Sequence, residues 1–182
     1  GRETAAVLEA YDFSDVDVLA DIGGGHGSKL SAVLERYPEM QGLLFDLPHV
    51  VERAREKLEQ AGLADRCRFE GGSFFESVPS GADSYLLRHI IHDWDDGRSL
   101  TILKNIREVI PDDGRLLIVE AVIPPGNDPF PAKFLDLTML VIPGGKERTR
   151  EEYEALYAEA GFTLSQIVPT STDMSVIEGR PA

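Results

Sequence analysis

The sequence has few of the features that extracellular, metal-binding or membrane proteins depend on. It holds a single cysteine, Cys67, so it can form neither an internal disulfide nor a cysteine-based metal cluster. It has no run of about 18 apolar residues that could cross a membrane. The first four residues show no apolar segment of the kind found in a signal peptide. We therefore expect a cytoplasmic protein with no membrane partner.

Positive charge is also scarce. The chain has 18 Lys and Arg residues against 32 Asp and Glu residues, a formal net charge of −14. Nucleic acids and anionic membrane surfaces repel such a chain, so we expect no nucleic-acid partner. The hydrophobic share of 42% is ordinary for a globular protein. A chain of this length buries a sizeable core, and we expect one domain over residues 1–182.

Short strand-like runs alternate with longer helical stripes along the chain. This alternation predicts an α/β fold, with a mostly parallel sheet covered by helices on both faces. The last two strands lie close together in the sequence, so we expect one of them to be antiparallel. The seven expected strands are residues 16–22, 42–45, 67–70, 83–87, 116–119, 162–168 and 174–177. The expected helices are residues 3–11, 28–37, 48–61, 102–110, 134–142 and 149–161, the last beginning with a capping box.

Glycines and polar residues follow the ends of the first five expected strands. Ligands of an open parallel sheet bind beyond the carboxyl ends of its strands, so this edge is the expected binding site. The residues concerned are Gly23, Gly24, Gly25, Gly27, Asp46, Gly71, Gly72, Ser73, Phe74, Arg88, His89, His92, Asp93 and Glu120.

The glycine run at residues 23–27 directly follows the first strand. Glycines let the backbone approach a ligand closely and leave a helix N-terminus open behind it. The run is not a P-loop, because Gly27-Ser28-Lys29 lacks the required order of Gly, Lys and Ser or Thr. It is also not a complete dinucleotide motif, because Leu30 occupies the third glycine position. A tight turn that binds no ligand is the alternative.

Asp46 lies about 20 residues after the glycine run, where a carboxylate can bind both hydroxyls of a ribose. The alternative is a favourable charge at the N-terminus of the helix that begins at Pro48. Because Asp46 occurs together with the glycines, we favour the ribose interpretation. The pair therefore indicates a cofactor that contains a nucleoside, without specifying which one.

His89 and His92 lie in a polar cluster after the fourth strand. With Asp93 they suit a metal site, but no third ligand has a diagnostic spacing, so we expect no metal. A histidine here can also act as a general base toward a hydroxyl. An equal alternative is a histidine that caps or packs beneath Trp94. Glu147, by residue pattern alone, indicates a solvated loop carboxylate.

Four segments, in order, resemble those of the plant caffeate-type and bacterial small-molecule O-methyltransferases that use S-adenosylmethionine. The similarity extends from about Val18 onward. It implies a Rossmann-like methyltransferase sheet and S-adenosyl-L-methionine as the cofactor. The segments are the glycine motif at 21–27, the ribose-binding segment at 45–51, the catalytic segment at 92–94 and the hallmark Gly-Gly-Lys-Glu-Arg-Thr at 144–149.

The resemblance implies a role for individual residues. His92 is the implied general base, with Glu120 and Glu147 flanking and orienting it. Ser73 and Phe74 would flank the adenine, and this family often has Asp where the chain has Ser73. The other implied cofactor residues are Asp21, Gly23, Gly25, Asp46, Leu47, Gly72 and Arg88. The implied acceptor-pocket residues are Asp136 and Met139.

The resemblance therefore implies transfer of a methyl group to a hydroxyl, most simply a phenol, of a small aromatic or polyketide-like molecule of secondary metabolism. The N-terminal dimerisation domain of this family has no counterpart in residues 1–182. We therefore expect a catalytic domain alone, whose full-length form is a homodimer. Two alternatives stay open. One is an NAD-dependent oxidoreductase, which shares the glycine loop and Asp46, and the other is a cofactor-binding member with lost or altered chemistry.

Overall fold

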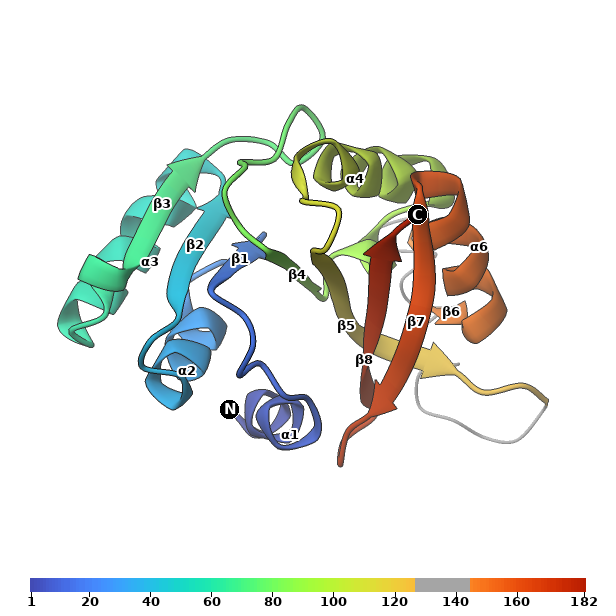
Figure 1. The fold of residues 1–182 in the computed structure, drawn as a ribbon, viewed down its shortest axis with the longest axis horizontal. Helices are drawn as coiled ribbons and strands as arrows, with labels where there is room; N and C mark the ends of the chain where they lie inside the picture. The colour runs from blue at the N-terminus through green and yellow to red at the C-terminus, as the bar shows by residue number, and fades with distance from the viewer. Residues whose placement is uncertain (127–144) are drawn as a thin grey trace.

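The computed structural model describes residues 1–126 and 145–182. The expected helix at 134–142, and with it Asp136 and Met139, lies outside the described residues. One mixed sheet runs through the centre of the described part, with strand order β3-β2-β1-β4-β5-β8-β7 (Figure 1). Its strands are β1 (Val18–Ile22), β2 (Gln41–Asp46), β3 (Cys67–Gly71), β4 (Ser84–Arg88), β5 (Arg115–Ile123), β7 (Phe162–Pro169) and β8 (Met174–Pro181).

The pairing of the strands confirms the predicted sheet. β1 pairs in parallel with both β2 and β4, and β3 and β5 continue the parallel part on either side. β8 lies between β5 and β7 and is antiparallel to both. A two-residue strand that the sequence pattern did not indicate, β6 (Arg148–Thr149), pairs in parallel with the end of β5.

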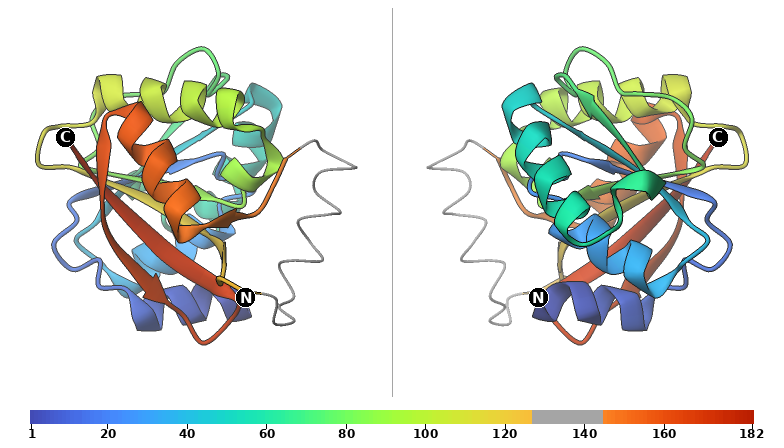
Figure 2. Two further views of the ribbon diagram at one scale, coloured as in Figure 1. Left: turned by 90° about the vertical axis from the view of Figure 1, so that its right-hand side faces the viewer. Right: turned by 90° about the vertical axis from the view of Figure 1, so that its left-hand side faces the viewer.

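Helices cover the two faces of the sheet, because successive strand residues point to opposite sides. Leu19 packs with α1 (Arg2–Ala10), α2 (Ser28–Arg36) and α3 (Pro48–Gln60) on one face. Its neighbour Ala20 packs on the other face, with α4 and α6. These are α4 (Asp96–Val109) and α6 (Arg150–Ala160). Figure 2 shows these two layers on opposite sides of the sheet. Two 3₁₀ turns, η1 (Ala64–Arg66) and η2 (Ile91–Asp93), complete the elements.

Several elements are longer than their apolar runs. β5 continues to Ile123 because Glu120, a polar residue, is part of the strand and fully buried. α4 begins at Asp96, before the apolar stripe, because the side chain of Asp95 accepts a hydrogen bond from the backbone N–H of Arg98. Thr149 and Glu152 form the predicted capping box, which fixes the start of α6.

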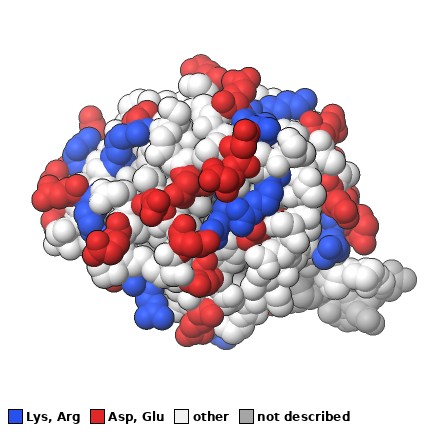
Figure 3. Space-filling view, viewed as in Figure 1, with Lys and Arg blue, Asp and Glu red and all other residues white. Residues whose placement is uncertain are grey.

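The face of the molecule seen in Figure 3 is rich in acidic side chains, as the net charge of −14 predicts. Asp and Glu side chains are spread over the face seen in Figure 3, with fewer Lys and Arg side chains among them. Within residues 1–126 and 145–182, no helix is long and apolar enough to cross a membrane. Over the same residues, no group of three or more His, Cys, Asp or Glu side chains could hold a metal ion.

Candidate active site

The glycine loop after β1 is fixed to the end of β2 by Asp46. The backbone N–H of Gly25 donates a hydrogen bond to Asp46 Oδ2 at 2.8 Å, and that of Leu47 donates to Oδ1 at 2.7 Å. Gly23, Gly25 and Gly27 all have positive φ, which other residues adopt only under strain. The loop therefore depends on its glycines for its shape and on Asp46 for its position.

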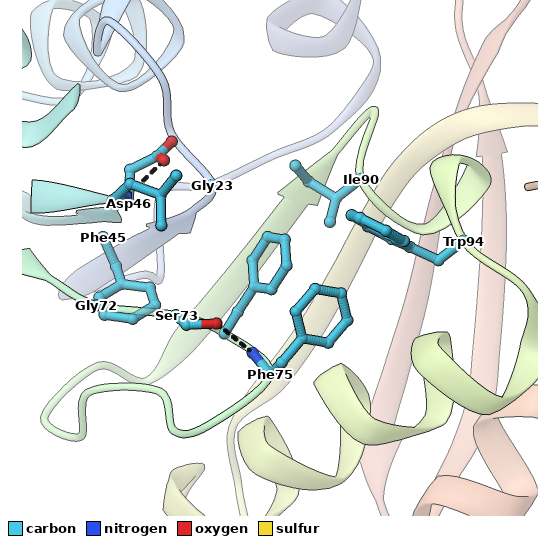
Figure 4. Close-up of a pocket in the computed structure, with 10 residues that line it drawn as sticks. Gly23, Phe45, Asp46, Gly72, Ser73, Phe75, Ile90 and Trp94 are labelled. Atoms are coloured by element: carbon cyan, nitrogen blue, oxygen red, sulfur yellow. Dashed lines mark hydrogen bonds between the residues drawn. The ribbon is translucent and has the colours of Figure 1, made fainter. Parts of the chain in front are cut away.

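A cavity of about 330 Å³ opens beside this loop (Figure 4). Its walls are largely aromatic, and its polar groups come from Asp46, Ser73 and the backbone. Apolar walls with few polar groups suit a flat ring that is held at its edges. The lining residues come from the ends of β1 and β2 and from the segments after β3 and β4. They are Gly23, Phe45, Asp46, Leu47, Gly72, Ser73, Phe74, Phe75, Ile90 and Trp94.

Part of this lining was predicted from the sequence. Gly23, Asp46, Leu47, Gly72, Ser73 and Phe74 were predicted cofactor residues. Phe45, Phe75, Ile90 and Trp94 were not. Phe45 lies in the segment 45–51 and Trp94 in the segment 92–94, and Phe75 and Ile90 adjoin Phe74 and His89 of the predicted binding edge. The ring of Phe75 lies edge-on between Phe74 and Trp94, with 4.9 Å between ring centroids on each side. This aromatic cluster forms one wall of the cavity.

Asp21 lies beneath the glycine loop rather than in the lining of the cavity. Its side chain is buried, and a Cβ atom at Gly24 would lie 2.9 Å from Asp21 Oδ2. Burial raises the pKa of Asp21 to about 6, against the opposing charges of Lys29 and Arg88. Among the described residues, Oδ2 has no hydrogen-bond partner. A buried acceptor of this kind favours a cationic or hydrogen-bonding ligand nearby.

Arg88, the last residue of β4, is buried and engaged with helix α1. Its guanidinium donates to Thr4 Oγ1 and to Glu3 Oε2, both at 2.7 Å. Glu3 Oε2 also lies 3.0 Å from His89 Nε2. Hydrogen bonds from His89 and Arg88 lower the pKa of Glu3 to about 2. Glu3 therefore joins α1 to the segment that follows β4, a contact that the sequence did not indicate.

His92 lies on η2, and its ring is held by Glu147. Nδ1 of His92 is 2.8 Å from Oε1 of Glu147, and Nε2 is 3.5 Å from Oδ1 of Asp93. Burial acts to lower the pKa of His92. The hydrogen bond with Glu147 and the charges of Glu120, Glu147 and Asp93 outweigh this effect and raise that pKa. The imidazole therefore lies in a site that favours its protonated form.

Glu147 is only 2% exposed. The interpretation from the residue pattern alone, a solvated loop carboxylate, is therefore wrong. The backbone of Gly145 packs directly on the turn that carries His92, because a Cβ atom at Gly145 would overlap the carbonyl oxygen of His92. This contact brings the residues after Gly145, and thus Glu147, against His92.

Glu120 contacts the backbone of the same turn rather than the imidazole. Its Oε1 accepts hydrogen bonds from the N–H groups of Ile90, Ile91 and His92, at 3.1, 2.7 and 3.1 Å. Its Oε2 accepts a hydrogen bond of 2.7 Å from the hydroxyl of Tyr153. Burial raises the pKa of Glu120, while the charge of His92 and these bonds act to lower it. Glu120 thus fixes the position of the turn.

Ile90 and Trp94 line the cavity on either side of His92 in the sequence. The arrangement therefore places a buried histidine, paired with a carboxylate, beside an aromatic pocket and a glycine loop. Such a histidine can accept a proton at Nε2 while Nδ1 is held.

Comparison with known proteins identifies the family of this chain. A family model described as the O-methyltransferase domain matches residues 3–163. The phenazine O-methyltransferase PhzM of Lysobacter antibioticus is 49% identical over 97% of this chain and 52% of its own length. The mitomycin biosynthesis 6-O-methyltransferase of Streptomyces lavendulae is 44% identical over 99% of this chain and 52% of its own length.

Solved structures agree with this result. The crystal structure of LaPhzM has a TM-score of 0.95 at 48% identity, over 100% of this chain and 55% of that one. The SAH-bound structure of a methyltransferase of calicheamicin biosynthesis has a TM-score of 0.92 at 41% identity, over 100% of this chain and 54% of that one. The chain spans about half the length of the curated relatives it matches.

Proposed function

The chain belongs to the family of O-methyltransferase domains, and we propose that it is a catalytic domain that methylates a hydroxyl of a small aromatic molecule with S-adenosylmethionine. The observation that carries this proposal is the pairing of His92 with Glu147, 2.8 Å apart, in a turn that borders the cavity. A phenolic or polyketide-like acceptor fits a site with a carboxylate-paired imidazole and aromatic walls.

The residues present fit the cofactor. Asp46 retains acceptor capacity beyond its bonds to Gly25 and Leu47, because a carboxylate has about four lone-pair sites, and can bind the ribose hydroxyls. Ser73 and Phe74 lie in the aromatic part of the cavity, which suits the adenine. Asp21 places a buried carboxyl beneath the glycine loop, near the expected position of the methionine part. When bound, S-adenosylmethionine supplies an activated methyl group on a positively charged sulfur.

His92 accepts the proton of the acceptor hydroxyl at Nε2. A phenol has a pKa near 10 and an unperturbed histidine one near 6.5, so the transfer is uphill by about 5 kcal/mol. The neighbouring carboxylates of Glu147, Glu120 and Asp93 raise the pKa of His92 and reduce this gap. Holding the acceptor against the base offsets the remainder, because oriented reactants gain up to about 7–11 kcal/mol.

We extend the proposal to a full-length form in which residues 1–182 would be joined to the dimerisation domain that the family resemblance implies, and we call this form the longer protein. Its relatives act on phenazine and mitomycin compounds by name, which supports a small aromatic acceptor. We expect it to be a homodimer, as the family resemblance implies, and to be cytoplasmic. Residues 1–182 contribute the cofactor site and the base.

Calorimetric titration with S-adenosylhomocysteine tests the cofactor class, with NAD in a parallel titration. We expect saturable binding of S-adenosylhomocysteine and none of NAD, and NAD binding alone would contradict the proposal. The base is tested with His92→Asn in the longer protein. This variant should keep its affinity for S-adenosylhomocysteine and lose methyl transfer to small phenols by about 10²–10⁴-fold.

A further inference from the structure

The turn that carries His92 is bound through its backbone on two sides. We call residues 90–94 the histidine turn. Glu120 accepts hydrogen bonds from three of its N–H groups. Arg148 donates to two of its carbonyl groups, those of Ile91 at 3.1 Å and Trp94 at 3.0 Å. A negative carboxylate therefore binds the N–H groups of the turn, and a positive guanidinium binds its carbonyl groups.

We propose that Arg148 is a positioning residue for His92, which sets the distance between the imidazole and Glu147 by fixing the carbonyl side of the histidine turn. This inference rests on the proposed function, in which His92 is the base. Nothing in the family resemblance assigned a role to Arg148 beyond its place in the segment at 144–149.

The surroundings of Arg148 fit this role. Its side chain is fully buried, and both its Nε and one terminal nitrogen donate to Asp96 Oδ1, at 3.0 and 2.8 Å. The same terminal nitrogen lies 3.2 Å from the hydroxyl of Ser99. Asp96 thus orients the planar guanidinium from the first turn of α4, while the guanidinium reaches the histidine turn.

Arg148 directly follows Glu147, so one short segment makes both contacts with the turn. Glu147 contacts the ring of His92, and Arg148 contacts the carbonyl groups on either side of it. A shift of the turn against this segment therefore changes the Nδ1–Oε1 distance. Fixing the carbonyl groups of the turn prevents such a shift.

The backbone before the histidine turn needs this support. His89 has a φ of 55°, in the left-handed region that residues other than glycine rarely adopt. Strained backbone persists only where its surroundings hold it in place. Glu120 and Arg148 bind the residues that directly follow His89, and so oppose relaxation of the strain.

The test compares Arg148→Lys with the wild-type chain. Lysine keeps the positive charge but lacks the planar set of donors, so it cannot bind both carbonyls and Asp96 together. We would follow the four histidines by NMR and assign His92 with a His92→Asn variant. The groups that face the imidazole are Glu147, Glu120, Asp93 and His89, and none of them changes in this variant.

We expect Arg148→Lys to lower the pKa of His92 toward the ordinary value of a histidine, because the bond to Glu147 that raises it is weakened, and to speed the exchange of its Nδ1 proton at least tenfold. Arg150→Lys is the matched control. Arg150 makes the same exchange possible two residues further on, at the exposed start of α6. This control should leave both readouts unchanged.

A lower melting temperature with an unchanged imidazole pKa and exchange rate would overturn the proposal, because it would show a merely structural role. If Arg148→Lys does not fold, Asp96→Asn takes its place. Asp96 is 56% exposed at its side chain, and the change loosens Arg148 without removing it. A lowered pKa of His92 then supports the proposal, and an unchanged pKa and Nδ1 exchange rate would reject it.

The same samples separate this inference from the proposed function. A wild-type chain that binds no S-adenosylhomocysteine counts against the proposed function, whereas the imidazole readouts test Arg148 in either case. In the longer protein, Arg148→Lys should lower kcat while the KM for S-adenosylmethionine stays within about twofold.

Discussion

The imidazole Nδ1 of His92 lies 2.8 Å from the carboxylate Oε1 of Glu147, although the two residues are 55 positions apart in the chain. Both side chains are buried. A carboxylate at this distance accepts a hydrogen bond from Nδ1–H, which keeps the proton on Nδ1 and leaves the lone pair of a neutral imidazole on Nε2. The pair therefore fixes which nitrogen of His92 can act as a base.

Glu147→Gln should weaken His92 as a base. The carboxylate raises the pKa of His92, and an amide lacks its charge, so the pKa should fall in the variant. Because a base must be deprotonated to act, the acidic limb of kcat/KM against pH should move to lower pH, while the plateau falls about 10–100-fold. Glu152→Gln, in the exposed first turn of α6, is the control. An unmoved acidic limb in Glu147→Gln would contradict this assignment.

Asp21 should make folding depend on pH. Its pKa is raised to about 6 by burial, against about 3.9 in an unfolded chain, which corresponds to about 3 kcal/mol. Since the folded state holds this proton more tightly, the stabilisation is complete below pH of about 4 and lost as the pH rises through about 6.

Relative to Asp21→Asn, the wild-type chain should therefore lose up to about 3 kcal/mol of unfolding free energy between pH 4 and pH 7. Urea denaturation over this range measures the difference. Asp112→Asn, at an exposed position, is the matched control and should follow the wild type. A constant difference between wild type and Asp21→Asn would show that Asp21 does not titrate in this range.

Asp46→Ala should reduce the affinity for S-adenosylhomocysteine about 10–100-fold. The change removes an acceptor for the ribose and the bond that holds Gly25, and hydrogen bonds to charged groups contribute about 1.5–3 kcal/mol. Asp46→Asn keeps one oxygen acceptor, so its affinity should lie between those of the wild type and Asp46→Ala. Calorimetry measures both variants, and equal affinity in all three proteins would remove Asp46 from the cofactor site.

Gly145→Ala should displace the turn that carries His92. A Cβ atom at this position would overlap the backbone of residues 92–94, so the two segments must separate. We expect methyl transfer in the longer protein to fall at least tenfold and the chain to lose about 1–3 kcal/mol of stability. Affinity for S-adenosylhomocysteine should fall less than methyl transfer, because Trp94 lines the cavity whereas the glycine loop and Asp46 lie elsewhere. Gly97→Ala, in the first turn of α4, where a Cβ would lie 3.4 Å from its nearest neighbour among the described residues, is the comparison.

The sequence predicted the features that depend on local pattern. Apolar runs and glycines placed the strands, the glycine loop and Asp46, because a strand and its following turn are encoded within a few residues. The capping box at Thr149 was equally visible. These features indicate the binding edge of the sheet from the sequence alone.

The features that depend on tertiary contact were not visible. Glu147 has the pattern of a loop carboxylate, and only the packing of Gly145 on the turn buries it against His92. Nothing in the spacing indicates that Glu120 binds backbone N–H groups or that Arg148 binds the carbonyl groups opposite. Each of these contacts joins segments about 30 to 60 residues apart, beyond the reach of periodicity.

The placement of β8 between β5 and β7 also sets the order in which the chain can fold. β5 (Arg115–Ile123) acquires its neighbour on that side only when residues 174–181 are available. Until then the apolar run of β5 presents an open edge, a template for pairing with another chain. Such a late, non-local pairing slows folding and leaves intermediates prone to aggregation. During synthesis, β5 is therefore among the last strands of the described residues to be enclosed.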